Sequence, residues 1–166
     1  MLATGIAGAG VPSPASSVLS PGYAKSVGFP EIAQSAKTTA VTTEKGCSTT
    51  YEAVYEDAAR RTALVSDVLN CRSAAAAADV LGAVRRHVRT DGSIRVPKEL
   101  GSSAFATASD APQYLVVWKA GSRVAITAID VDLTGTSASE AAPEPLTAAQ
   151  RETLQHAALR QNSLYG

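Results

Sequence analysis

The sequence predicts an α+β domain, an antiparallel sheet of about four to five strands with two helices packed on one face. Three observations lead to this prediction. The only two cysteines, Cys47 and Cys71, enclose a segment that fits a hairpin. A Ser-capped, alanine-rich helix follows at once from Ser73. A second apolar hairpin over residues 113–133 precedes a helix that begins near Thr147.

Length and charge bound the class of protein. The 166 residues leave room for one domain, and the formal net charge is zero. A nucleic-acid binder needs surplus Lys and Arg to neutralise phosphates, so we expect no nucleic-acid partner. The same balance argues against a polybasic membrane-surface protein. No segment is apolar over the length that a bilayer-spanning helix needs, so we expect no transmembrane span.

The first 46 residues differ in composition from the rest. Residues 2–11 are small and apolar and contain Ala7-Gly8-Ala9, which is typical of a signal-peptide cleavage region. We interpret residues 1–11 as a signal-peptide remnant, with an ordinary Ala/Gly tail as the alternative. Residues 12–46 predict a Pro/Ser/Thr-rich arm or linker with little regular structure, except a short edge strand over 38–43. Residues 47–166 then form the single domain.

The segment between the cysteines reads best as two strands that meet at residues 57–60. Partners across such a hairpin have residue numbers that sum to about 118, so Cys47 would lie opposite Cys71. Facing positions are about 4.5–5.5 Å apart, which suits a disulfide better than a metal site or a redox pair. β-branched residues favour a strand over 63–71. Residues 49–56 also fit helical spacing, and there both alternatives stay open.

The two predicted helices have clear starts and stops. Ser73 caps the first helix, whose apolar stripe is Ala77, Val80, Leu81, Val84 and Val88. Arginines in its last turns suit the negative end of the helix dipole, and residues 90–92 end the helix. Thr147 and Gln150 form a capping box at the start of the second helix, which runs to about Asn162.

The second hairpin is the strongest strand signal. With a turn at residues 120–121, Val117 faces Val124 and Leu115 faces Ile126 on one face of the sheet. The other face carries Tyr114, Val116, Trp118, Ala125, Thr127 and Ile129. Both faces are apolar, so the hairpin should be central in the sheet or cover a cleft. Residues 103–108 predict one further strand.

Few residues suggest chemistry. Tyr114 and Trp118 are the candidate ligand-binding residues, with burial in the core as the alternative. His87 and His156 fall on the polar sides of the helices, where surface histidines are the simpler interpretation. We predict no catalytic residues, no metal ligands and no cofactor. The basic run 85–89 suits the helix dipole, with an anionic surface such as phospholipid or polyphosphate as the alternative.

A resemblance adds to this interpretation. The segments LVSDVLNCRSAAAAADVL, RVAITAIDVDL and TAAQ together resemble small exported cell-envelope domains of mycobacteria and related actinobacteria, both sensor-type domains and lipoproteins. The similarity covers residues 45–162 in pattern. It implies export and a binding or accessory role, and it transfers no functional residues. The chain lacks the second disulfide of many sensor-type domains and the lipobox cysteine of lipoproteins.

The sequence thus predicts a secreted or cell-envelope, non-catalytic binding module. Its partner would be an envelope lipid, glycan or protein, met by a monomeric domain through the sheet face. One alternative is a small hydrolase-like enzyme that uses His87 or His156 together with a Ser, Asp or Glu. The other alternative is a purely structural surface protein, which sequence does not separate from the first.

Overall fold

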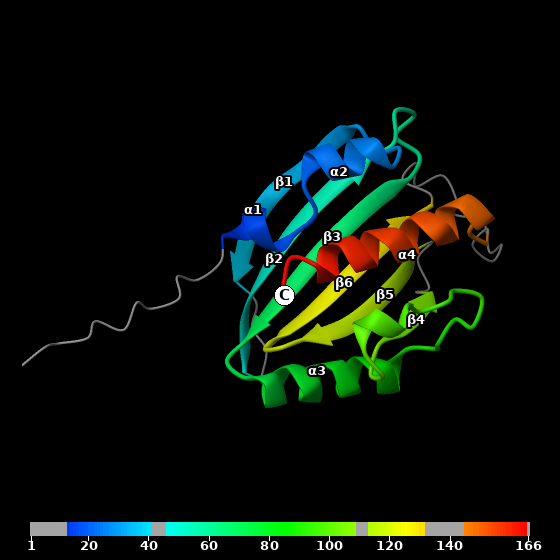
Figure 1. The fold of residues 1–166 in the computed structure, drawn as a ribbon. Coiled ribbons are helices and arrows are strands. Elements are labelled where there is room, and N and C mark those ends of the chain that lie inside the picture. The colour runs from blue at the N-terminus through cyan, green and yellow to red at the C-terminus, as the bar shows by residue number, and fades with distance from the viewer. Residues whose placement is uncertain (1–12, 41–45, 109–112, 132–144, 166) are drawn as a thin grey trace, which may run out of the picture.

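The computed structural model describes residues 13–40, 46–108, 113–131 and 145–165. These residues form one antiparallel sheet of six strands, in the order β1-β2-β3-β6-β5-β4, with helices on both faces (Figure 1). The strands are β1 (Glu31–Ala40), β2 (Cys47–Glu56), β3 (Ala63–Cys71), β4 (Phe105–Ala108), β5 (Gln113–Ala120) and β6 (Arg123–Asp130). The helices are α1 (Pro14–Ser17), α2 (Pro21–Ser26), α3 (Ala74–His87), the short η1 (Lys98–Leu100) and α4 (Ala148–Asn162). The α+β class is confirmed, with more strands and helices than predicted. The predicted signal-peptide remnant lies outside the described residues.

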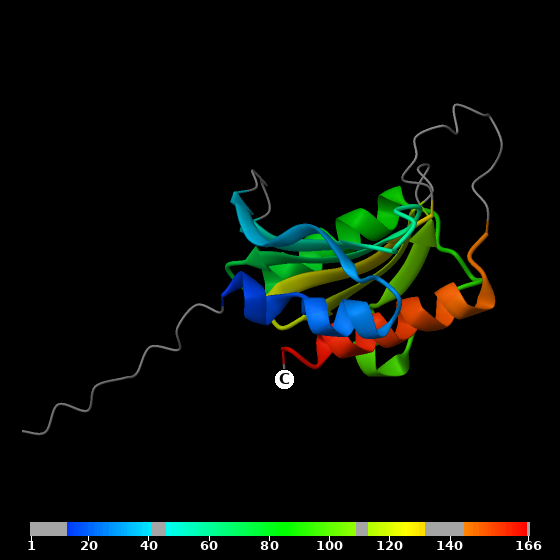
Figure 2. The same cartoon turned by 90° about the horizontal axis from the view of Figure 1, so that it is seen from above.

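The helices do not share one face of the sheet. α4 packs on one face with α1 and α2, and α3 packs on the other (Figure 2). We call these the α4 face and the α3 face. The prediction of two helices on one face is therefore wrong. The physical reason is in the hairpin β5–β6, whose apolar side chains point both ways and need cover on both faces.

The segment predicted to be an arm or linker contains regular structure. Pro14 and Pro21 each stand in the first turn of a helix, where a missing N–H costs nothing. Between these helices Leu19 is buried in the core on the α4 face. Its amide donates to Ser66 Oγ (2.9 Å), and its carbonyl accepts from the Tyr55 hydroxyl (2.5 Å). These bonds pair the buried backbone with side chains of β2 and β3.

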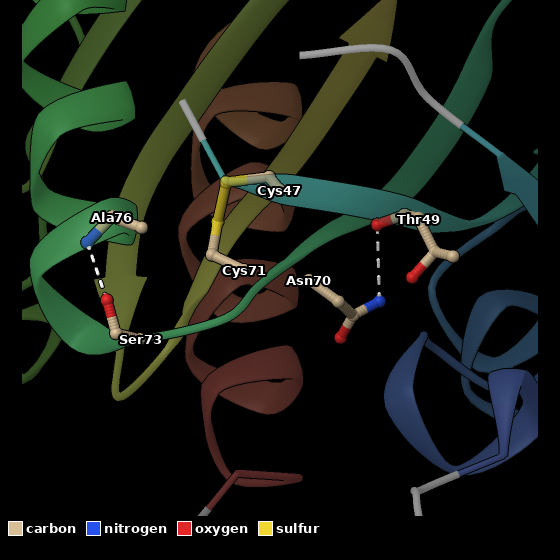
Figure 3. The surroundings of a disulfide bond; sticks show 6 residues. All are labelled: Cys47, Thr49, Asn70, Cys71, Ser73 and Ala76. Atoms are coloured by element: carbon tan, nitrogen blue, oxygen red, sulfur yellow. Dashed lines mark hydrogen bonds between the residues drawn. A yellow bond between two sulfur atoms is a disulfide. The ribbon is translucent and has the colours of Figure 1, made fainter. Parts of the chain in front are cut away.

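The hairpin β2–β3 has the predicted disulfide. Cys47 pairs with Cys71 and is bonded to it, at the start of α3 (Figure 3). Residues 49–56 are strand throughout, so the helical alternative is excluded. Beyond the cysteines the register moves by one residue: Thr49 pairs with Asn70, because Ser48 is a bulge. That single extra residue decides which side chains face each other along the rest of the hairpin.

The hairpin β5–β6 keeps its predicted faces with a shifted register. Ala120 pairs with Arg123 around a two-residue turn at 121–122, where Gly121 adopts φ 59°. Val117 consequently faces Ile126 and not Val124. The shift is an even number of residues, so every side chain stays on its predicted face. The hairpin lies inside the sheet between β3 and β4, as its two apolar faces predict.

Both long helices begin as predicted. Ser73 Oγ accepts the amide of Ala76 at 3.1 Å, and this bond caps α3 (Figure 3). Thr147 and Gln150 form the full capping box of α4, each side chain bonded to the backbone of the other. Val80 and Leu81 of the α3 stripe pack on Val117 and Val124, across β5 and β6.

Candidate functional site

The two aromatic candidates lie in the core of the α4 face. Trp118 is fully buried and Tyr114 is 6 % exposed, both in the cluster that α4 covers. The Trp118 indole N–H donates to Asn162 Oδ1 at the end of α4, at 2.9 Å. A buried indole needs such an acceptor, so this contact is sufficient to explain the tryptophan. Ligand binding by these two residues stays a prediction.

The two histidines are exposed and far from one another in the fold. His87 ends α3 and His156 lies on α4, so they stand on opposite faces of the sheet. His156 lines a shallow hollow of about 330 Å³ with Glu99, and neither Ser nor Cys is among the described residues that line it. This hollow brings His156 together with Glu99, one of the residue types that the hydrolase-like alternative pairs with a histidine, and that alternative stays a prediction.

The α3 face offers a different candidate. α3 packs against β3, β5 and β6, and Cys47, at the start of β2, belongs to the cluster beneath the helix, whereas Glu52 and Val54 further along β2 do not. Side chains that alternate along β2 and β3 are half-buried there. We define the acidic sheet face as five half-buried residues on this side of the sheet, four from β2 and β3 and one from β6: Glu52, Val54, Val65, Asp67 and Asp130. It combines apolar surface with carboxylates.

Two carboxylates face each other at the centre of this surface. Glu52 pairs directly with Asp67 of β3 on one side and with Lys37 of β1 on the other. Gln34 Nε2 donates to Glu52 Oε1, and Thr50 Oγ1 donates to Asp67 Oδ1. Partial burial raises the pKa of Asp67 above its ordinary value, and the neighbouring charge of Glu52 raises it further, against the lowering effect of Thr50. Like charges placed opposite in a sheet destabilise it.

Asp130 extends the carboxylates to the end of β6. It pairs with Ala63 and Gln113 on the same face as Asp67. Its Oδ1 is buried and has no hydrogen-bond partner among the described residues. Burial raises the pKa of Asp130, and a hydrogen bond from Gln113 opposes the rise. A carboxylate oxygen without a partner has acceptor capacity to offer to a donor.

The sequence did not indicate this surface. A hairpin whose partners sum to 118 places Glu52 opposite Ser66 and Asp67 opposite Tyr51, on different faces of the sheet. The bulge at Ser48 brings both carboxylates onto one face. One signal was available in the sequence. If the register of β2 and β3 is moved by one residue, Glu52 faces Asp67 and Val54 faces Val65.

Comparison with protein-family models, with curated proteins and with solved structures found no match to this chain. None of the helices described is long and apolar enough to cross a membrane. Within the described ranges, no three His, Cys, Asp or Glu side chains are grouped as metal ligands would be. The class of protein that the structure defines is a disulfide-bonded α+β domain with an acidic, partly apolar sheet face.

Proposed function

We propose that the protein is a non-catalytic binding module, and that the acidic sheet face binds a ligand with an ammonium or guanidinium group. The observation behind this proposal is the pair of facing carboxylates, Glu52 and Asp67, which lie outside the hydrophobic cluster beneath α3. Such a pair costs stability, and carboxyl groups with a raised pKa, as Asp67 has, gather at functional sites.

The chemistry of the surface suits an organic cation. An ammonium or guanidinium group donates several hydrogen bonds, and carboxylates accept them strongly. Val54 and Val65 lie beside the carboxylates in the register and give apolar contact to an alkyl stem. A basic side chain of a protein partner has both parts. The negative charge of two carboxylates is then neutralised on binding, which removes their mutual repulsion.

Calorimetric titration with a triarginine peptide tests the proposal. We expect saturable binding that Glu52→Gln together with Asp67→Asn reduces at least tenfold, since each change removes a charged acceptor. Glu99→Gln with Glu152→Gln is the matched control, because it removes two carboxylates from the opposite side of the sheet. Equal loss in both double variants, or no binding by the wild type, would refute the proposal.

The same pair of variants separates binding from folding. Removing the facing charges should raise the free energy of unfolding by about 0.5 kcal/mol, within the range of cross-strand pairs. The melting temperature would then rise by about 1–2 °C. A variant that is more stable than the wild type but binds the peptide less tightly indicates a binding site that lowers the stability of the fold.

We also propose an extracytoplasmic location. The Cys47–Cys71 disulfide supports it, because disulfides persist in oxidising compartments and are rare in the cytosol. Mass spectrometry of the protein produced in an actinobacterial host tests this location. The mature chain should begin near residue 10 and weigh two hydrogens less than its reduced form, whereas a reduced chain that keeps Met1 would contradict export.

A further inference from the structure

A second charged surface lies on α3. Its cations come from α3, from the segments that flank the helix on both sides and from β5: Arg72, Arg85, Arg86, Arg89 and Lys119. The four arginines are exposed, and Lys119 is half-exposed. No described acidic residue forms an ion pair with any of the five. We call this set the α3 basic patch.

The concentration of charge is high for a neutral protein. The patch takes five of the fifteen Lys and Arg residues, and Asp79 is the one acidic residue on α3. The remainder of the chain therefore has an excess of acidic residues. A net charge of zero argued against anionic partners, but it does not show that positive charges are concentrated on one surface and negative charges elsewhere. A local field depends on the charges within about a Debye length and not on the total.

The shape of the patch is broad. Arg72 and Arg86 line one hollow of about 510 Å³ along α3, and Arg85 and Lys119 line another of about 150 Å³. Ala78 and Gly82 line both hollows, so the surface between them is a low ridge of small residues.

The cations are also widely spaced. Fourteen residues separate Arg72 from Arg86, which corresponds to about 21 Å along a helix. A single phosphate group does not span that distance. The guanidinium carbon of Arg85 lies 5.7 Å from the centroid of the Phe105 ring. This cation–π contact leaves the guanidinium positively charged.

We propose that the α3 basic patch docks the protein on a bilayer of anionic lipids. A broad, two-sided array of unpaired cations matches a surface of many headgroups better than it matches one strand of a polyanion. α3 stands on the face of the sheet opposite α4 and protrudes from it (Figure 2). Contact through α3 leaves the α4 face and its N-terminal helices away from the membrane. The binding is electrostatic and reversible, because the exposed residues of α3 between Arg72 and Arg85 are alanines and Asp79, which insert little apolar area.

Sedimentation with vesicles tests this proposal without any ligand for the acidic sheet face, which lies on the same side of the sheet as α3. The probes are vesicles of phosphatidylglycerol and phosphatidylcholine in equal parts, and vesicles of phosphatidylcholine alone. We expect the wild type to bind the anionic vesicles at 50 mM salt and to leave them at 500 mM salt. Each basic side chain near such a surface strengthens binding about fivefold, so Arg72→Gln with Arg86→Gln should weaken it about 25-fold.

The matched control is Lys25→Gln with Arg95→Gln, which removes two exposed cations outside the patch and should change binding little. Circular dichroism confirms that both variants are folded. Equal binding to neutral vesicles, equal losses in both double variants, or no binding by the wild type would overturn the proposal. Binding to soluble polyphosphate without binding to anionic vesicles would overturn it as well, in favour of a polyanion.

Discussion

Removing the Cys47–Cys71 disulfide should destabilise the protein by a predictable amount. The bond closes a loop with a sequence separation of 24 residues. Loop-closure entropy for a chain of that length predicts a loss of about 3.5 kcal/mol at 25 °C when both cysteines become alanine. For a domain of this size each kcal/mol corresponds to about 2–4 °C, so the melting temperature should fall by about 7–14 °C.

Differential scanning calorimetry and chemical unfolding of Cys47→Ala with Cys71→Ala measure this loss. The matched control is the wild type in the presence of a phosphine reductant, which breaks the same bond without substituting either cysteine. Both should lose the same stability, and the reductant should not affect the double variant. A loss below about 1 kcal/mol would show that the ends of β2 and β3 are held together without the bond, and that the entropic reasoning fails here.

Three further predictions concern single side chains. Gln161→Leu should lower the free energy of unfolding by about 2 kcal/mol, because it leaves the buried Thr127 hydroxyl without its acceptor, which lies 2.7 Å away. Adding Thr127→Val should restore part of this loss in chemical unfolding. If the losses of the two single variants simply add in the double variant, this reasoning is contradicted. Arg60→Gly should raise the melting temperature by about 1–4 °C, since Arg60 holds φ 53°, whereas Ala59→Gly should not stabilise. The raised pKa of Asp67 means that folding favours its protonated form, so wild-type stability relative to Asp67→Asn should rise as the pH falls from 7 toward 4; a constant difference would refute the shift.

Local signals in the sequence predicted the elements well. Ser73 and the Thr147–Gln150 pair each cap a helix as expected, because capping depends on residues within one turn. The apolar alternation over residues 113–130 gave both faces of β5 and β6 correctly. The disulfide followed from the symmetric position of the cysteines about one turn. Each of these inferences depended on neighbours close in sequence.

Contacts between distant segments were harder to predict. The N-terminal segment reads as a linker because its apolar residues are sparse, yet Leu19 is buried through bonds to Ser66 and Tyr55. Those partners are visible only once β2 and β3 are placed. The helices cover both faces of the sheet because β5 and β6 are apolar on both sides, and the sequence does not state which helix takes which face.

The acidic sheet face was missed for a more specific reason. A bulge is a one-residue event, and Gly46, which has φ 77° two residues before Ser48, does not fix where the extra residue falls. Its consequence is large, since one residue of register decides whether Glu52 and Asp67 share a face. The hypothesis that Tyr114 and Trp118 form the recognition surface concerns the opposite face of the sheet, on which α4 packs.

The location of ligand binding is the central claim, and amide chemical shifts test it most directly. In a ¹H–¹⁵N spectrum titrated with triarginine, the amides of β2 and β3 around Glu52 and Asp67 should shift in a saturable way, while those of α4 should not. Shifts centred on Trp118 and α4, or no saturable shifts at all, would contradict the assignment of the acidic sheet face as the binding surface.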